Sequence, residues 1–186
     1  MNRDTYDALA GLLTYPAPNF RQQMALWIGV LPPAVGSAVV QFAAEVSDFS
    51  LEQVQELFTQ TFDLNPLCSL ELGWHLFGEN YERGLLLVRM REELRRAGVE
   101  ESAELPDHMT HALRLLGRMD HERAVDFAAA ILLPALMKML ESMRGKNTPY
   151  EHVLRALAAA LRADFPEIPL PQTKAELPVL SHEVSV

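Results

Sequence analysis

The stretch ELPDHM, residues 104–109, separates two helical patterns and organises the chain around it. A charged helical pattern ends before it at Gly98, and an apolar pattern starts at Met109. Proline fixes φ and needs no N–H partner, so Pro106 suits the first turn of a helix. The other N–H groups of that turn lack intrahelical acceptors and can bind a carboxylate or the backbone of a guest chain.

Two interpretations of this break stay open at the level of sequence. In the first, Glu104, Asp107 and His108 form part of a binding site, because polar side chains at a helix break can reach a groove. In the second, Glu104 or Asp107 caps the following helix and His108 is a solvated residue of its first turn. Spacing alone favours the second interpretation.

Composition predicts one globular domain and excludes several classes of protein. The chain has 186 residues, of which 49% are hydrophobic, and this is enough for one real core. A net charge of −9 argues against a nucleic-acid binder, which needs a basic face. The one cysteine, Cys68, excludes an internal disulfide and a four-thiolate metal site. The first residues show no signal-peptide pattern, so we expect a cytoplasmic protein.

Helical periodicity runs through most of the chain, and no useful stretch alternates with period two. Ser50 and Gln53 form a capping box, and helices are also expected over 68–77 and from Asn80 to Gly98. The sequence predicts an all-α, bundle-like single domain of about nine helices over residues 1–165, with a hinge or loop near 99–107. Residues 166–186 contain four prolines without periodicity and are predicted to be an extended or mobile tail.

The apolar run over 124–140 is shorter than the ~20 residues that a bilayer requires. It also contains Asp126, Pro134 and Lys138, so a central buried helix is the better interpretation. Pro134 should kink this helix or mark a join, because it removes an i→i−4 hydrogen bond. We therefore expect no insertion into a membrane.

No catalytic site or metal site emerges from the motifs. His108 and His111 could share a helix face as metal ligands do, but a di-iron bundle needs paired Glu-x-x-His motifs that this chain lacks. A solvated or capping role suits both histidines better. Cys68 and His75 could share a face, yet no third group orients them. A binding module is the leading class, and a metal-dependent helical enzyme and a helical transcriptional regulator are the competing ones.

An acidic helical bundle can bind a basic, amphipathic guest in an apolar groove. Acids at helix breaks would select the guest's charges, and the candidates are Asp63, Glu104 and Asp107. The candidate groove lining is aromatic and comprises Phe58, Phe62, Trp74 and Phe77. Packing in the core is the stronger interpretation of these aromatic residues.

Several short motifs, taken in order, point to a family. They are FTQTFDL at 58–64, CSL at 68–70, Gly78-Glu79 with Arg83-Gly84, and ELPDH at 104–108. In order and spacing they resemble the nitrate reductase molybdenum cofactor assembly chaperones, the NarJ group of the TorD/DmsD-like redox-enzyme maturation chaperones. The resemblance covers residues 6–161 in helix pattern and is sharpest over 58–109.

The resemblance implies an all-α, non-catalytic cytoplasmic chaperone without a bound catalytic cofactor. Such a chaperone binds the N-terminal tail of the apo catalytic (alpha) subunit of a respiratory nitrate reductase and holds it for molybdenum cofactor insertion and membrane assembly. Molybdenum cofactor delivery proteins are further candidate partners, and another molybdoenzyme is the alternative client. The family's guest-site hallmark falls on Pro106, Asp107 and His108, and Asp63 and Arg83 match other family positions.

A binding mechanism follows as a hypothesis. The guest tail folds as a helix in a groove between the two halves of the chain, with residues 104–108 as rim and hinge. His108, whose reference pKa is near ~6.5, would then make binding sensitive to pH between 6 and 8. The break over 99–106 would also allow domain swapping.

Overall fold

Helix caps and prolines set most of the helix ends in the computed structural model, which describes residues 2–168. The helices are α1 (Arg3–Leu12), α2 (Phe20–Val30), α3 (Pro33–Glu45), α4 (Leu51–Phe58), α5 (Leu72–Phe77), α6 (Tyr81–Arg96), α7 (Met109–Leu116), α8 (His121–Phe127), α9 (Leu133–Met143) and α10 (Tyr150–Asp164). Two π-helical turns, η1 (Thr59–Asp63) and η3 (Ala128–Leu132), and one 3₁₀ turn, η2 (Pro66–Cys68), accompany them. Because η3 joins α8 to α9 without a break, residues 2–168 hold nine continuous helices, which confirms the predicted all-α fold.

Local sequence signals explain several of these boundaries. Ser50 and Gln53 form the predicted capping box at the start of α4. Gly98 has φ 65° just after α6, a left-handed conformation that glycine adopts without steric cost. Pro134 lies in the first turn of α9, where its missing N–H does no harm, and the wide turn of η3 precedes it. Pro134 therefore marks a join, as predicted.

The predicted helix over 68–77 is wrong in its first half. Residues 66–68 form the 3₁₀ turn η2, and the α-helix starts only at Leu72. Glu71 instead forms an isolated antiparallel bridge with His108. A long-range backbone pairing thus takes these residues out of the helix, and no local pattern could reveal it. The predicted tail over 166–186 lies, from residue 169 onward, outside the described residues.

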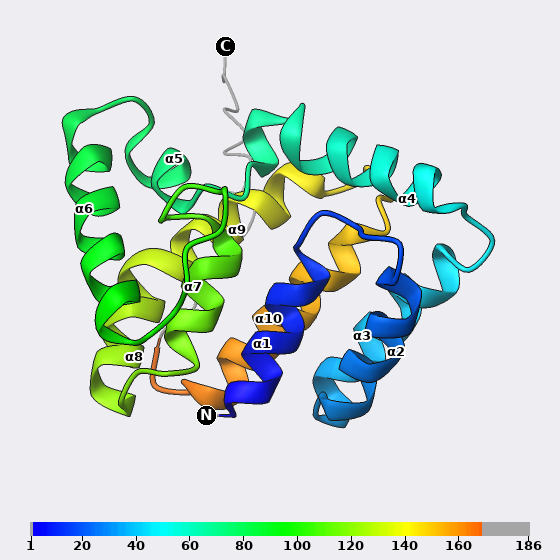
Figure 1. Cartoon of the computed structure of the whole chain (residues 1–186), viewed down its shortest axis with the longest axis horizontal. Coiled ribbons are helices and arrows are strands. Elements are labelled where there is room, and N and C mark those ends of the chain that lie inside the picture. The colour runs from blue at the N-terminus through cyan, green and yellow to red at the C-terminus, as the bar shows by residue number, and fades with distance from the viewer. Residues whose placement is uncertain (1, 169–186) are drawn as a thin grey trace, which may run out of the picture.

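Helices α1 and α10 lie at the centre of the molecule (Figure 1). Helix α1 packs against α2, α7 and α10, and α3 packs along α10. Helices α5 to α9 form the other side, where α5 contacts both α6 and α9. Polar pairs tie the centre together, since the Tyr6 hydroxyl donates to Asp164 at 2.9 Å and Arg118 binds Asp7 at 2.9 Å.

An aromatic cluster fills the core beneath α4. Phe58 and Phe62 are 4% and 2% exposed, and their ring centroids are 5.0 Å apart. Both rings pack edge-on against Tyr150 from the first turn of α10. Core packing, the stronger of the two interpretations, is confirmed for these two residues.

The apolar run over 124–140 becomes the helix formed by α8, η3 and α9, and Ala128, Leu132 and Leu136 are fully buried in it. Within residues 2–168, no helix combines the length and apolar character needed to cross a bilayer. The buried-helix interpretation of this run is therefore confirmed.

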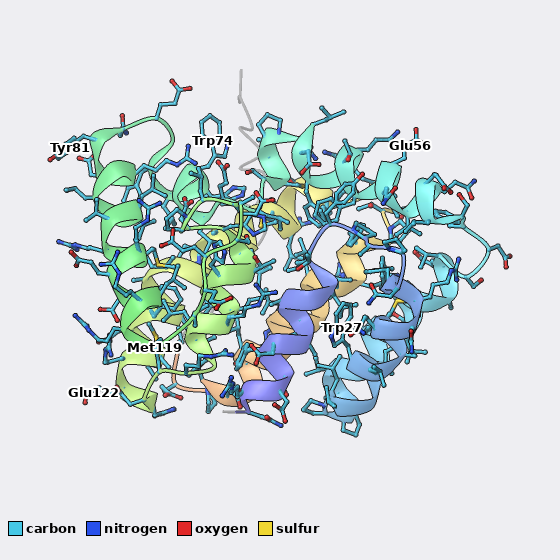
Figure 2. The ribbon with its side chains drawn as sticks, viewed as in Figure 1. Trp27, Glu56, Trp74, Tyr81, Met119 and Glu122 are labelled. Atoms are coloured by element: carbon cyan, nitrogen blue, oxygen red, sulfur yellow. The ribbon has the colours of Figure 1, made fainter. Side chains whose placement is uncertain are left out.

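The close approach of α2 to α1 depends on Gly11. A Cβ atom at this position would lie 2.3 Å from the Trp27 ring, which Figure 2 shows beside α1.

We expect Gly11→Ala to lower the free energy of unfolding by about 1–3 kcal/mol, since the ring must shift within a packed core. Urea denaturation checks this. Gly29→Ala is the matched control, because nothing lies within 4 Å of a Cβ there, and an equal loss in both variants would contradict the packing argument.

Candidate functional site

Two segments far apart in the sequence meet where α5 and α7 begin. The backbone N–H of Met109 donates to the carbonyl of Leu70 at 2.7 Å, and the N–H of Leu72 donates to the carbonyl of Asp107 at 3.0 Å. These two bonds form the antiparallel bridge between Glu71 and His108. The ELPDHM stretch is thereby fastened to the start of α5.

The carboxylate of Asp107 completes this junction. Its Oδ2 atom accepts a hydrogen bond of 2.9 Å from the backbone N–H of Gly73, in the first turn of α5. The Nε atom of Arg83 lies 3.7 Å from the same oxygen, and Arg83 also binds Glu71 at 2.5 Å. We call Glu71, Gly73, Arg83 and Asp107 the Asp107 clamp. Asp107 therefore caps a helix, but that helix is α5 and not α7, which follows it in the sequence.

The clamp is buried and has little spare space. Asp107 is 0% exposed, and its burial raises the pKa of the carboxyl group, while the Gly73 N–H and the Arg83 charge act in the opposite direction. A Cβ atom at position 73 would lie 2.6 Å from the Asp107 Oδ2 atom, so glycine is required there. In this structure Asp107 supports the site from within and does not touch solvent.

Both histidines near the break are buried, which corrects the expectation that they are solvated. His108 caps α7, because its Nδ1 atom accepts from the Thr110 N–H at 3.4 Å and lies 2.8 Å from the Thr110 hydroxyl. Burial, together with the nearby His111 and Arg114, lowers the pKa of His108 to about 4. The ring is therefore neutral between pH 6 and 8 in the free protein, which argues against His108 as the source of a pH-sensitive binding in that range.

His111 fixes the loop between α6 and α7. Its Nε2 atom accepts from the Ser102 N–H at 3.0 Å, so its Nδ1 atom carries the proton and donates to the Leu105 carbonyl at 2.9 Å. Glu101 adds an ion pair of 2.9 Å with Arg91 on α6. The loop is thus held at several points and presents a defined surface.

This loop closes one side of a cavity of about 330 Å³, which we call the α1–α4–α7 cavity. It is lined by Thr14, Tyr15, Phe58, Asp63, Ser102, Ala103, Glu104, His108, Thr110 and Arg114. The lining comes from the turn after α1, the end of α4 with η1, the α6–α7 loop and α7, which meet at the junction of the two sides of the molecule (Figure 1). A cavity of this size suits a small group of inserted side chains.

Four residues predicted from the sequence line this cavity together, namely Phe58, Asp63, Glu104 and His108. Asp63 and Glu104 are exposed at its rim. Pro106 and Asp107 are buried and do not line it. The predicted residues therefore divide into those that can touch a guest and those that shape the site.

The other predicted residues lie elsewhere. Arg83 stacks over Trp74, with its Cζ atom 5.8 Å from the ring centroid, and both residues belong to the α5–α6 side. Phe77 is half-buried at the end of α5, and Phe62 belongs to the core. None of these residues lines the α1–α4–α7 cavity.

Sequence reasoning missed Tyr15, Thr110 and Arg114. Tyr15 directly precedes Pro16 after α1, and it is 49% exposed, with its ring centroid 5.5 Å from that of Phe58 in an edge-on arrangement. Arg114 lies on α7, and the apolar spacing in the sequence of α7 indicates only the face that packs in the core. No signal in the sequence marks these residues, because the exposure of Tyr15 and the meeting of α7 with the turn after α1 are known only from the structure.

The comparisons with known proteins agree with the motif resemblance. A family model described as nitrate reductase delta subunit matches residues 29–163. The chain belongs to this family.

Two similar proteins support the assignment to this family. The probable nitrate reductase molybdenum cofactor assembly chaperone NarJ of Bacillus subtilis (strain 168) is 25% identical over 163 residues, which cover 84% of this chain and 88% of the relative. The nitrate reductase molybdenum cofactor assembly chaperone NarJ of Escherichia coli (strain K12) is 27% identical over 122 residues, or 62% of this chain and 52% of that relative. Both are named chaperones, in agreement with the prediction of a non-enzymatic chain.

The side chains also bear on the metal site and the Cys68–His75 pair considered from the sequence. Within residues 2–168, no three histidine, cysteine or acidic side chains come together as metal ligands. The Cys68 thiol lies 2.8 Å from the Ser142 hydroxyl, while the His75 Nε2 atom lies 2.6 Å from the Ser69 carbonyl. Cys68 and His75 therefore bond to different partners and do not form a nucleophile–base pair.

Replacement of Asp107 tests the clamp. We expect Asp107→Ala to lower the free energy of unfolding by about 3 kcal/mol, because Arg83 loses a buried counter-charge and the Gly73 N–H loses its acceptor. Asp107→Asn keeps an acceptor oxygen and should cost less. Chemical denaturation measures both variants. The control is Asp126→Ala, which removes an exposed acid from α8. If Asp126→Ala lowered the free energy of unfolding as much as Asp107→Ala, the clamp would not be what stabilises this junction.

The buried His108 ring should make the free energy of unfolding depend on pH. Between pH ~6.5 and about 4 the unfolded chain binds more protons on this ring than the folded chain, so the free energy of unfolding falls as the pH drops. The contribution of this one ring lowers the free energy of unfolding by about 3 kcal/mol when the pH reaches about 4. His108→Gln should remove it and leave the pH dependence above 7 unchanged.

The measurement is urea denaturation of wild type and His108→Gln at a series of pH values. Asp107, whose raised pKa acts with the opposite sign, is present in both proteins, so its effect cancels in the difference. Parallel stability curves from pH 7 to 4 would show that the ring is not buried as described.

Proposed function

We propose that this chain is an assembly chaperone for a respiratory nitrate reductase and acts during molybdenum cofactor insertion. Its membership of the nitrate reductase delta subunit family supports this, together with the names of its relatives. The client is the apo catalytic (alpha) subunit, and the chaperone binds its N-terminal tail in the cytoplasm. It holds the tail until the cofactor is inserted and membrane assembly proceeds, while molybdenum cofactor delivery proteins act as further partners.

The observation that carries the proposal is the meeting of Phe58, Asp63, Glu104 and His108 at the α1–α4–α7 cavity. These residues come from two segments far apart in the sequence, and both acids, Asp63 and Glu104, are exposed. Tyr15 and Phe58 supply an apolar wall between them. An apolar pocket with acids at its rim suits a guest helix that carries apolar anchors and basic residues.

Two exposed leucines follow the two cavity acids in the chain. Leu64 follows Asp63 and is 73% exposed, and Leu105 follows Glu104 and is 40% exposed. Each cavity acid thus has a solvent-exposed leucine beside it in the chain. One guest side chain can enter the cavity while its neighbours cover these leucines, which gives a contact larger than the cavity itself.

The buried part of the ELPDHM stretch acts indirectly. Pro106, Asp107 and His108 set the course of the loop that carries Glu104, and Arg83 holds Asp107 in place. In this proposal Asp63 and Glu104 contact the guest, while Asp107 and Arg83 position the loop. Substitutions in the two groups should therefore differ in effect, since only the clamp residues should change the stability of the free protein.

Calorimetric titration with a synthetic peptide of the first ~15–30 residues of the catalytic subunit tests the proposal, a length suited to a helix-in-groove guest. We expect saturable one-to-one binding. Glu104→Gln, Asp63→Asn and Tyr15→Ala should each weaken it about fivefold to tenfold, the range of one lost interfacial contact. Added salt should weaken binding further, because exposed charges are screened.

Glu56→Gln is the matched control, since Glu56 is an exposed acid of α4 outside the cavity lining (Figure 2). Equal losses in Glu56→Gln and in the cavity variants would mean that general charge, and not the cavity, attracts the guest. Absence of binding to this peptide, with binding to the tail of another molybdoenzyme, would assign a different client.

A further inference from the structure

A second concave surface lies between α9 and α10, away from the α1–α4–α7 cavity. It encloses about 620 Å³ and is lined by Met137, Leu140, Glu141, Arg144, Arg155, Ala158, Ala159, Arg162 and Ala163. We call it the α9–α10 groove. Its floor is apolar, and Leu140, Ala158 and Ala159 also pack against the core. The small side chains of Ala158, Ala159 and Ala163 on α10 allow a peptide backbone to approach the helix closely.

Three arginines border the groove, although the chain has a net charge of −9. Arg144 and Arg155 pair with acids of their own helices, at 2.7 Å with Glu141 and at 2.5 Å with Glu151. These are exposed pairs one helical turn apart, which contribute little and exchange easily. The groove thus has an apolar floor between basic ends and favours an acidic, apolar segment.

We propose that the α9–α10 groove binds the chain's own segment 169–186. The sequence after Ile168 contains the run ELPVLSHE at 176–183, in which three apolar residues lie between Glu176 and Glu183. This charge pattern complements the groove, where the apolar floor lies between arginines. The interaction does not depend on the proposed client of the chaperone.

The geometry of the chain supports this occupant. The described residues end at Ile168, which packs against the core a few residues after Arg162 and Ala163 at one end of the groove. Arg155 lies seven residues before Arg162 on α10, about 10 Å away along the axis at 1.5 Å per residue. An extended segment of 18 residues spans up to about 60 Å, so it reaches the full groove easily.

The direction of the chain also fits. A segment that leaves α10 beyond Arg162 and turns back along the groove meets the Arg162 end first and the end formed by Arg144 and Arg155 last. Covalent connection adds a high effective concentration, so weak contacts are sufficient to keep the groove occupied.

A spin-label experiment on the full chain tests this inference. Ser181→Cys places one reactive thiol within 169–186 for a nitroxide, while Cys68 is fully buried. With methionine methyl groups labelled for NMR, Met137 in the groove should lose most of its signal. Met24 on α2 and Met90 on α6 should keep theirs, because neither helix packs against α9 or α10 in any extended contact.

The charge prediction has its own matched pair of variants. Arg155→Glu with Arg162→Glu should restore the Met137 signal, whereas Arg89→Glu with Arg95→Glu on the exposed side of α6 should leave it lost. An unchanged Met137 signal in the spin-labelled chain would overturn the proposal. So would signal loss that persists when chains carrying only the spin label are mixed with chains carrying only the isotope label, since the occupant would then be a second copy.

Discussion

The Asp107 carboxylate is the constraint on which the candidate site depends. Helix α5 has only six residues, too few to be stable alone, and its first N–H groups need acceptors. Asp107 supplies them with its backbone carbonyl and its side chain, from the turn before α7. The pairing closes a loop of more than thirty residues that contains all of α6, so the cost in chain entropy is offset by several bonds made together. The pairing therefore fixes the start of α5 relative to the start of α7.

The consequences of this clamp reach the surface through the α6–α7 loop. Once Asp107 is fixed, His108 caps α7 and His111 binds the backbone at Ser102 and Leu105. Both ring nitrogens of His111 have partners in the loop, so the segment from Ser102 to Leu105 presents Glu104 in a defined position. The ELPDHM stretch thus combines two roles. Its first two residues face solvent, and the following three are buried and hold them in place.

Sequence reasoning succeeded where structure is local. The capping box at Ser50, the join at Pro134 and the helix end at Gly98 each follow from the preferences of a few neighbouring residues. The all-α fold follows from periodicity for the same reason. The grouping of Asp63 with Glu104 also came from local pattern, because both residues lie at helix breaks, and the structure brings them to one cavity.

Sequence reasoning failed where a contact joins segments that are distant in the chain. An acid before a helix predicts a cap, but the sequence does not say which helix the carboxylate will reach, and Asp107 caps α5 instead of α7. The two histidines show the same limit, because their burial and the low pKa of His108 depend on elements packed over them. Residues 68–71 had helical character that a single backbone bridge overrode.

The distribution of charge links the two concave surfaces. A net charge of −9 describes a chain that attracts basic partners, yet the α9–α10 groove carries three arginines and the α1–α4–α7 cavity carries exposed acids. Under the proposed function and the proposed docking of segment 169–186, a basic guest would be drawn to the acidic rim and repelled by the arginines, whereas the segment with Glu176 and Glu183 would be sorted the other way. A single apolar groove of neutral character would bind guest and segment alike. Opposite charges at two grooves would allow both to be occupied at once.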